Sequence, residues 1–375
     1  MSVASPTPIL ETVSLVKHFG GGRQLFSRSA PVQAVGGVSL KVMNGETFAI
    51  VGESGCGKST LGRLMIRLLE PTCGDVIYAG RNLGGLTKTE MRGLRRELQI
   101  VFQDPFASLN PRMSVADIVG EPLWLHDIGT RAERRDRVID IFRTVGLRPD
   151  MADRYPHEFS GGQRQRIGIA RALAGEPKLI LGDEPVSALD VSIQAQIVNL
   201  LEELKERLKL TLIIVAHDLA VIRHMSDRVA VMYLGEVVEI APTDALFDAP
   251  LHPYSHALLD AIPVAAAGPP RVRTPLQGDV PSPTRPPSGC KFHTRCPHAK
   301  KLCAEARPIL ETPSDQGGRQ VACHFWREIW STGGTPQLKP QPNAVLSQRL
   351  GLYRARQNGQ ADLLLPSTSS AKETA

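Results

Sequence analysis

Short apolar segments alternate with longer helical patterns between residues 47 and 240 of the 375-residue chain. The segments are rich in Val, Ile and Leu, and they lie at 47–51, 98–102, 179–181, 212–215 and 229–232. Such alternation is typical of parallel strands that are joined by crossover helices. The pattern therefore predicts an α/β fold with a parallel sheet.

Two changes in amino-acid composition divide the chain further. Residues from about 86 to 165 are charged and helix-forming, which predicts a helical insertion into the α/β core. Prolines gather from residue 263 onward and mark an extended connector. We expect a core domain at 1–255, a small C-terminal module rich in Pro and Cys at 256–335, and a disordered tail at 336–375, which has few aromatic residues.

The composition is that of a soluble globular protein, with 42% hydrophobic and 22% charged residues. The net charge of +6 would suit a nucleic acid, an anionic lipid surface or a nucleotide, so charge does not choose a partner. Residues 1–15 contain no basic segment that leads into an apolar stretch, and no apolar run approaches the roughly 18 residues of a membrane span. We expect the chain to stay in the cytosol and to act at a membrane only through a partner.

A glycine-rich loop follows the first apolar segment. The sequence Gly-Glu-Ser-Gly-Cys-Gly-Lys-Ser at 52–59 has the spacing of a phosphate-binding loop, and a helical pattern follows it. Glycines let successive backbone amides point at phosphates, and the helix adds its positive end. Lys58 would reach the β and γ phosphates of a nucleoside triphosphate, and Ser59 would ligate Mg²⁺. We expect the nucleotide to be bound by Gly52, Ser54, Gly55, Gly57, Lys58, Ser59 and Thr60.

Two carboxylates follow the apolar segment at 179–181. Asp183 would hold Mg²⁺ through water, and Glu184 would polarise the attacking water as a general base or orienting group in phosphoryl transfer. An acidic pair after a strand can also be a helix cap. The phosphate-binding loop favours the catalytic interpretation.

The sequence Phe-Ser-Gly-Gly-Gln-Arg-Gln-Arg at 159–166 opens another helical pattern. Ser160 can cap this helix, but a cap alone does not explain two glycines, which weaken a helix. The segment resembles the signature motif of ABC ATPases, with Phe159 in place of the commoner leucine. The resemblance implies a head-to-tail dimer, in which Ser160, Gly161, Gly162 and Gln163 of this chain contact ATP that is held on the phosphate-binding loop of the partner subunit.

Further elements of the ABC family occur in order along the chain. Gln103 and His217 each follow an apolar segment, and Asp190 ends a Ser-Ala-Leu-Asp sequence. The resemblance implies that Gln103 senses Mg²⁺ and the attacking water, that His217 contacts the γ phosphate, and that Asp190 contacts the opposite subunit. Phe19 resembles the aromatic that stacks on adenine, and a core role is equally open. The implied fold is a P-loop NTPase core of the ABC ATPase type at 1–255, with ATP and Mg²⁺ as cofactors.

Three regions are similar to the ATPases of bacterial dipeptide and oligopeptide importers. They lie at 103–113, at 252–259, and at 278–297 in the C-terminal module. The resemblance covers about residues 9–330 and is closest to the second of the two different ATPase subunits that such importers usually contain. It implies a subunit that hydrolyses ATP to power peptide import.

The resemblance also implies partners and a location. These are a second, homologous ATPase subunit in a heterodimer, two membrane permease subunits, an extracytoplasmic solute-binding protein, and the cytoplasmic face of the cell membrane. An importer of nickel, glutathione or a sugar stays open, because cargo is chosen by other subunits. A nucleic-acid or ribosome-associated ABC protein would be expected to carry two ATPase domains or a long coiled coil, so no nucleic-acid partner is expected.

Four of the six cysteines lie in the C-terminal module, at Cys290, Cys296, Cys303 and Cys323. In a reducing cytosol such clustering favours metal or cluster ligation over disulfides. Zinc ligands usually come in pairs two to four residues apart, whereas the gaps here are five, six and nineteen residues. Zn²⁺ and four unligated thiols stay open, as does replacement of a cysteine by His293, His298 or His324. The importer family's similar extensions imply a 4Fe-4S cluster on the four cysteines.

Overall fold

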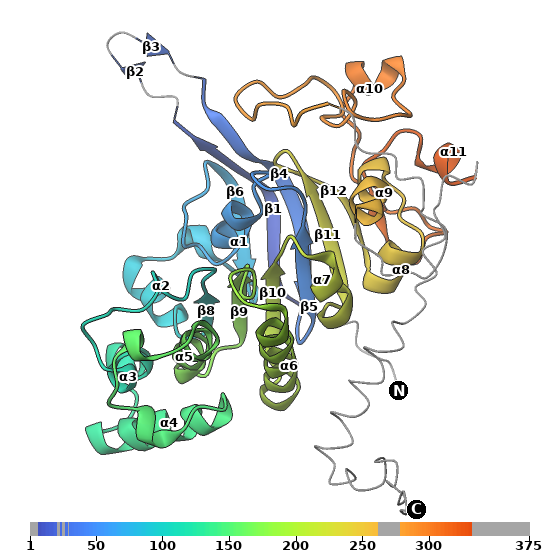
Figure 1. The fold of residues 1–375 in the computed structure, drawn as a ribbon. Coiled ribbons are helices and arrows are strands. Elements are labelled where there is room, and N and C mark those ends of the chain that lie inside the picture. Colours follow the sequence, from blue (N-terminus) through green and yellow to red (C-terminus); the bar gives the residue numbers. More distant parts are fainter. Residues whose placement is uncertain (1–6, 21–22, 25–26, 29, 262–277, 332–375) are drawn as a thin grey trace, which may run out of the picture. The chain divides into compact units, whose positions relative to one another are not determined.

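The computed structural model describes residues 7–20, 23–24, 27–28, 30–261 and 278–331. In these residues two larger sheets, a short hairpin and the helices around them form an α/β fold (Figure 1). The tail predicted at 336–375 and the connector prolines between 263 and 275 lie outside the described residues.

A seven-stranded sheet forms the centre of the fold. Its strands are Thr47–Val51 (β5), Leu98–Val101 (β8), Leu179–Asp183 (β9), Thr211–Val215 (β10), Arg228–Tyr233 (β11), Glu236–Pro242 (β12) and Gln320–Val321 (β13). The order is β13-β12-β11-β5-β10-β9-β8, and the strands from β11 to β8 run parallel, whereas β12 and β13 are antiparallel to their neighbours. All five predicted strands form and make up the parallel part, so the predicted α/β fold is confirmed.

The parallel strands are covered by helices. Every residue of β5, β9 and β10 is buried, which explains their continuous apolar sequences. The crossover helix α1 packs on β9 and β10, α7 packs on β5 and α6, and α8 packs on β11 and β12. These helices are Lys58–Met65 (α1), Val191–Leu208 (α6), Leu219–Met225 (α7) and Thr243–Asp248 (α8).

A second, antiparallel sheet was not predicted. It has the order β4-β1-β6-β7, and its strands are Pro8–Phe19 (β1), Val32–Met43 (β4), Cys73–Tyr78 (β6) and Arg81–Asn82 (β7). Arg23–Gln24 (β2) and Ser27–Arg28 (β3) pair as a short hairpin between β1 and β4. Apolar side chains of this sheet share one core with the central sheet, as Leu10 and Val38 do with Phe48 and Ile50.

A group of helices follows β8 (Figure 1, green). These are Val115–Leu125 (α3), Arg131–Thr144 (α4) and Gly161–Ala174 (α5), which pack on one another around the buried side chains of Val119, Phe142 and Ile167. Lys88–Leu94 (α2) precedes β8, and 3₁₀ turns lie at Leu83–Gly85, Pro149–Met151 and Pro156–Glu158. Because β8 lies inside the range 86–165 and α5 continues to Ala174, the helical group begins in the later part of that range and ends beyond it. The predicted domain boundaries stay a prediction.

The C-terminal region has little regular structure beyond Pro253–Asp260 (α9), Lys301–Glu305 (α10) and Trp326–Ser331 (α11). Strand β13 pairs with β12 and forms one edge of the central sheet. The fully buried Glu239 carboxylate on β12 accepts hydrogen bonds from the backbone amides of Leu251 and His252, both at 2.9 Å, and pairs with Arg319 at 3.1 Å. No helix in the described ranges is both long and apolar enough to span a membrane.

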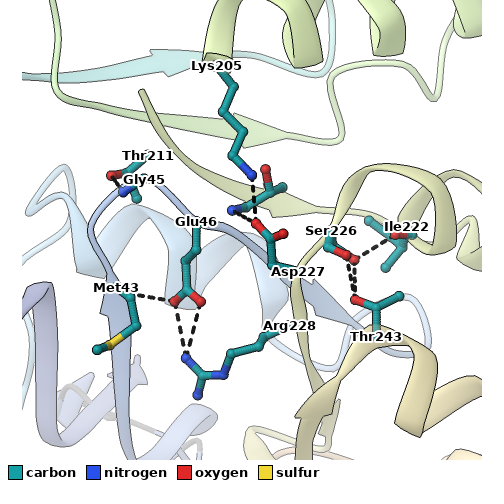
Figure 2. Close-up of polar contacts among 11 residues, drawn as sticks. Met43, Gly45, Glu46, Lys205, Thr211, Ile222, Ser226, Asp227, Arg228 and Thr243 are labelled. Carbon is teal, nitrogen blue, oxygen red and sulfur yellow. Dashed lines mark hydrogen bonds and ion pairs between the residues drawn. The ribbon is translucent and has the colours of Figure 1, made fainter. Parts of the chain in front are cut away.

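Polar contacts hold the turn before β5 to neighbouring strands (Figure 2). The Glu46 carboxylate accepts a hydrogen bond from the Met43 amide and pairs with Arg228 at 3.1 Å. The Asp227 carboxylate accepts hydrogen bonds from the Thr47 amide at 2.7 Å and from Lys205 at 2.6 Å. These contacts lie at the amino ends of β5 and β11, so they brace the sheet at the end opposite the phosphate-binding loop.

Candidate functional site

The glycine-rich loop lies between β5 and α1, as predicted. Gly52, Gly55 and Gly57 have φ angles of 151°, 78° and 104°, which L side chains rarely adopt. A Cβ atom at Gly52 would lie 2.1 Å from the Met232 carbonyl oxygen, so only glycine lets the loop approach β11 this closely. The loop geometry therefore depends on these glycines.

The Lys58 side chain binds the backbone of the phosphate-binding loop. Its ammonium group donates hydrogen bonds to the carbonyl oxygens of Gly52 at 2.8 Å and Glu53 at 2.9 Å, and the residue is only 5% exposed. The side chain thus points back across the loop, with its positive charge among backbone groups. Ser59 and Thr60 follow in the first turn of α1, where helix amides are not used within the helix.

Asp183 ends β9 and is buried. Its Oδ2 atom accepts a hydrogen bond from Nε of Arg63 at 3.0 Å and forms an ion pair with the NH2 group of the same arginine at 2.9 Å, whereas no donor in the described part of the chain reaches the buried Oδ1. The neighbouring Gly182 is needed for packing, since a Cβ atom there would lie 2.9 Å from Cδ1 of Ile214 and 3.0 Å from Cγ of Pro185. Strand β9 therefore holds the Asp183 carboxylate in a fixed position, with Oδ1 free to accept a hydrogen bond.

Three predicted residues meet at one carboxylate oxygen. Oε2 of Glu184 accepts a hydrogen bond from Nε2 of Gln103 at 2.9 Å and lies 3.1 Å from Nδ1 of His217. These residues follow β9, β8 and β10, so neighbouring parallel strands bring them to the same edge of the sheet. Glu184 has a φ of 50°, which is uncommon for a residue other than glycine. Such backbone conformations are often found at functional sites.

The predicted cap of α5 forms. The Ser160 hydroxyl accepts a hydrogen bond from the Gln163 amide at 3.4 Å, and the Gln163 side chain accepts one from the Ser160 amide at 3.0 Å. Gly162 has a packing reason, because a Cβ atom there would lie 2.5 Å from Cγ2 of Ile193. A Cβ atom at Gly161 would meet only Leu189, at an ordinary 3.6 Å, so packing does not account for that glycine.

Asp190 and Phe19 lie on other elements. Asp190 precedes α6 and makes no side-chain cap hydrogen bond to it. Phe19 ends β1 with 40% of its surface exposed, and the Lys17 ammonium lies 5.1 Å from the centre of its ring. Because the ring is exposed, it is available for stacking, whereas the ring of a core residue would not be.

All four cysteines of the C-terminal region line one cavity of about 20 Å³, together with His293, His298 and His324. Burial raises the pKa of the Cys296 thiol to about 11 and that of Cys323 to about 12, and the neighbouring thiols add to both shifts. Nowhere in the described ranges are three or more Cys, His, Asp or Glu side chains arranged to hold a metal ion. The thiols are thus gathered, but not in a ligand geometry.

Several contacts of the site were not predicted. Arg63 binds Asp183, and Glu53 of the phosphate-binding loop is contacted by both Tyr254 and Arg295. Arg63 lies on the predicted helix after the loop, one turn beyond Ser59, which was the only available signal. Nothing in the sequence spacing relates Arg295 to a loop 242 residues earlier.

Comparisons with known proteins agree with this geometry. A family model described as ABC transporter matches residues 35–187, and one described as the C-terminal region of oligopeptide/dipeptide transporters matches 238–303. The chain is 51% identical over 330 residues to the oligopeptide transport ATP-binding protein AppF of Bacillus subtilis, covering 87% of this chain and 100% of that one. It is 52% identical over 309 residues to OppF of Escherichia coli, covering 81% and 92% of the two chains.

A solved structure has the same fold. The dimeric bacterial ABC transporter cassette MJ0796 matches with a TM-score of 0.56 at 31% identity, covering 62% of this chain and 98% of that one. The phosphate-binding loop, the carboxylates after β9 and the capped start of α5 thus occur in a chain that matches its relatives over nearly their full length. The chain belongs to the ATP-binding proteins of ABC transporters, and it carries the C-terminal region of the oligopeptide/dipeptide type.

Proposed function

We propose that this chain hydrolyses ATP to power the import of dipeptides and oligopeptides through a membrane permease. The observation that carries the proposal is the convergence of Gln103 and His217 on the Glu184 carboxylate, at the sheet edge that also carries the phosphate-binding loop. Peptide as the cargo is supported by the matched C-terminal region and by the names of the relatives.

The proposed chemistry assigns a role to each group of the site. Lys58 and the backbone amides of residues 52–60 bind the phosphates, and Phe19 stacks on adenine. Glu184 orients the attacking water, and Gln103 and His217 hold its carboxylate in place, with His217 also contacting the γ phosphate.

Mg²⁺ would neutralise charge on the transferred phosphate. Ser59, Gln103 and Asp183 are the proposed groups that hold it. The fit is supported by the buried Oδ1 atom of Asp183, which has no donor among the described residues and so remains free to accept from a metal-bound water.

Hydrolysis is proposed to take place in a head-to-tail dimer with a second, different ATPase subunit. Ser160, Gly161, Gly162, Gln163 and Asp190 would contact the nucleotide or the partner there. The exposed start of a capped helix offers amides to the phosphates, which supports this arrangement. The dimer would bind two permease subunits at the cytoplasmic face of the cell membrane, and a solute-binding protein would deliver the cargo.

A solute-binding protein encoded beside this chain would test the cargo. Its ligand, released from the purified protein and identified by mass spectrometry, should be a mixture of short peptides. Nickel, glutathione or a sugar in its place would replace peptide as the cargo, and the ATPase chemistry would stand.

We also propose that Cys290, Cys296, Cys303 and Cys323 bind a 4Fe-4S cluster, with Zn²⁺ as the competing occupant. Their gathering around one cavity supports a shared ligand. The raised pKa values keep the thiols of Cys296 and Cys323 neutral at pH 7, so binding of a metal or cluster must displace their protons. Such a ligand would tie together a region with little regular structure.

Metal analysis of anaerobically purified protein should find about four iron and four sulfide per chain, with a brown colour. Cys296→Ser should bleach the protein, because it removes one of the four ligands. Cys73→Ser is the matched control, since Cys73 is an exposed thiol on β6 away from this cavity. Colourless protein with one zinc per chain would contradict the iron–sulfur assignment, and metal-free, folded protein would contradict both.

A further inference from the structure

The phosphate-binding loop is contacted by an arginine from the C-terminal region. The NH1 group of Arg295 lies 2.8 Å from Oε2 of Glu53, and its NH2 group lies 3.0 Å from Oε1. The two parallel hydrogen bonds make a bidentate pair, the strongest and most directional kind of arginine–carboxylate contact. The Arg295 side chain is only 6% exposed and that of Glu53 24%, so water screens the pair less than a surface ion pair.

The loop backbone is held at the same residue. The Glu53 amide donates a hydrogen bond to the hydroxyl of the buried Tyr254 at 2.9 Å. Tyr254, Tyr233 and Phe292 pack together with ring centres 4.7 to 5.3 Å apart. Arg295 is fixed to this cluster, since its amide donates to the Phe292 carbonyl oxygen at 3.0 Å. The arginine therefore reaches Glu53 from a rigid base.

Glu53 affects nucleotide binding in two ways. Its carboxylate adds a negative charge to a loop that must accept phosphates, which a partner guanidinium offsets. Its carbonyl oxygen is also one of the two anchors of the Lys58 ammonium. A displacement of Glu53 would consequently change both the charge of the loop and the position of its lysine. The hydrogen bonds with Glu53 raise the pKa of the Arg295 guanidinium above its ordinary value, which marks a stabilised charged form.

We propose that Arg295 is a positioning residue for the nucleotide: by pairing with Glu53 it fixes the phosphate-binding loop and offsets the loop's negative charge. The C-terminal region then takes part in ATP binding in addition to any role in transporter assembly. The inference rests on the ATP site proposed above.

Binding of Mg-ATP to the full-length chain tests the proposal by calorimetry. Arg295→Ala should weaken binding on the order of tenfold, the range of coupling between two parts of a protein. Arg307→Ala is the matched control. Arg307 is an arginine of the same region that pairs with Glu236 at 3.3 Å and is 55% exposed, and its loss should leave the dissociation constant unchanged.

Two further variants separate positioning from simple loss of structure. The double variant Glu53→Gln with Arg295→Ala removes the unpaired charge and should recover part of the affinity. Arg295→Lys, which keeps the charge but not the bidentate geometry, should fall between wild type and alanine. Wild-type affinity in Arg295→Ala would overturn the proposal. So would equal losses in the single and double variants accompanied by a lower melting temperature, because they would indicate a structural role only. Weaker ATP binding by Lys58→Ala tests the ATP site separately.

Discussion

Replacing Glu184 by glutamine should leave Mg-ATP binding nearly unchanged and slow hydrolysis by about 100-fold or more, the usual size of a general-base contribution. Glutamine has the same shape and can keep a contact with Gln103, but its amide cannot orient or deprotonate water as the carboxylate does. The phosphate-binding loop is untouched by the change. The expected signature is therefore a fall in kcat without a matching change in the dissociation constant of ATP.

Steady-state hydrolysis and equilibrium binding, measured on the same preparation, check this result. Glu176→Gln is the matched control, because Glu176 forms surface ion pairs with Arg96 and Arg137 and its side chain is 60% exposed. That control should hydrolyse ATP at the wild-type rate. Near-normal turnover in Glu184→Gln would remove Glu184 from the catalytic assignment.

Replacing Lys58 by alanine should instead weaken ATP binding by about 10- to 100-fold, which corresponds to the roughly 1.5–3 kcal/mol of hydrogen bonds to a charged group. The ammonium group is the charge that would meet the transferred phosphate. It also bridges the carbonyl oxygens of Gly52 and Glu53, so its loss would loosen the loop as well. Binding and rate should fall together.

Lys178→Ala is the control for charge, because Lys178 pairs with Glu97 on the surface and its side chain is 64% exposed. Thermal denaturation of both variants should accompany the binding measurement, since Lys58 is buried. Unchanged affinity for ATP in a folded Lys58→Ala protein would mean that the loop does not bind the phosphates in the manner proposed.

The strands of the central sheet were predictable because their cause is local. Residues 47–51, 179–181 and 212–215 are continuous apolar runs, and β5, β9 and β10 are buried throughout. The antiparallel sheet was missed although β4 alternates between exposed and buried positions from Gly37 to Val42, because its partner β1 does not alternate strictly and their pairing carries several register shifts. Periodicity identifies a regular strand better than an irregular one.

The candidate site likewise combines features that follow from local sequence with features that depend on tertiary packing. The spacing of Gly52, Gly55 and Gly57 predicted the loop because the backbone itself demands glycine there. The contact between Arg295 and Glu53 could not be predicted, because it depends on how the nearby Phe292 packs on Tyr233 and Tyr254. Side-chain contacts across long sequence separations follow from tertiary packing, which no local pattern encodes.

ATP-driven peptide uptake tests the central claim most directly. Proteoliposomes that contain the permease pair, the second ATPase and this chain are supplied with Mg-ATP on the side of the membrane that carries the ATPases. A labelled dipeptide, bound to the solute-binding protein, is supplied on the opposite side. Wild-type chain should support uptake that Glu184→Gln abolishes and Glu176→Gln preserves. Uptake that continues with Glu184→Gln, or ATP hydrolysis that peptide delivery never stimulates, would contradict the account.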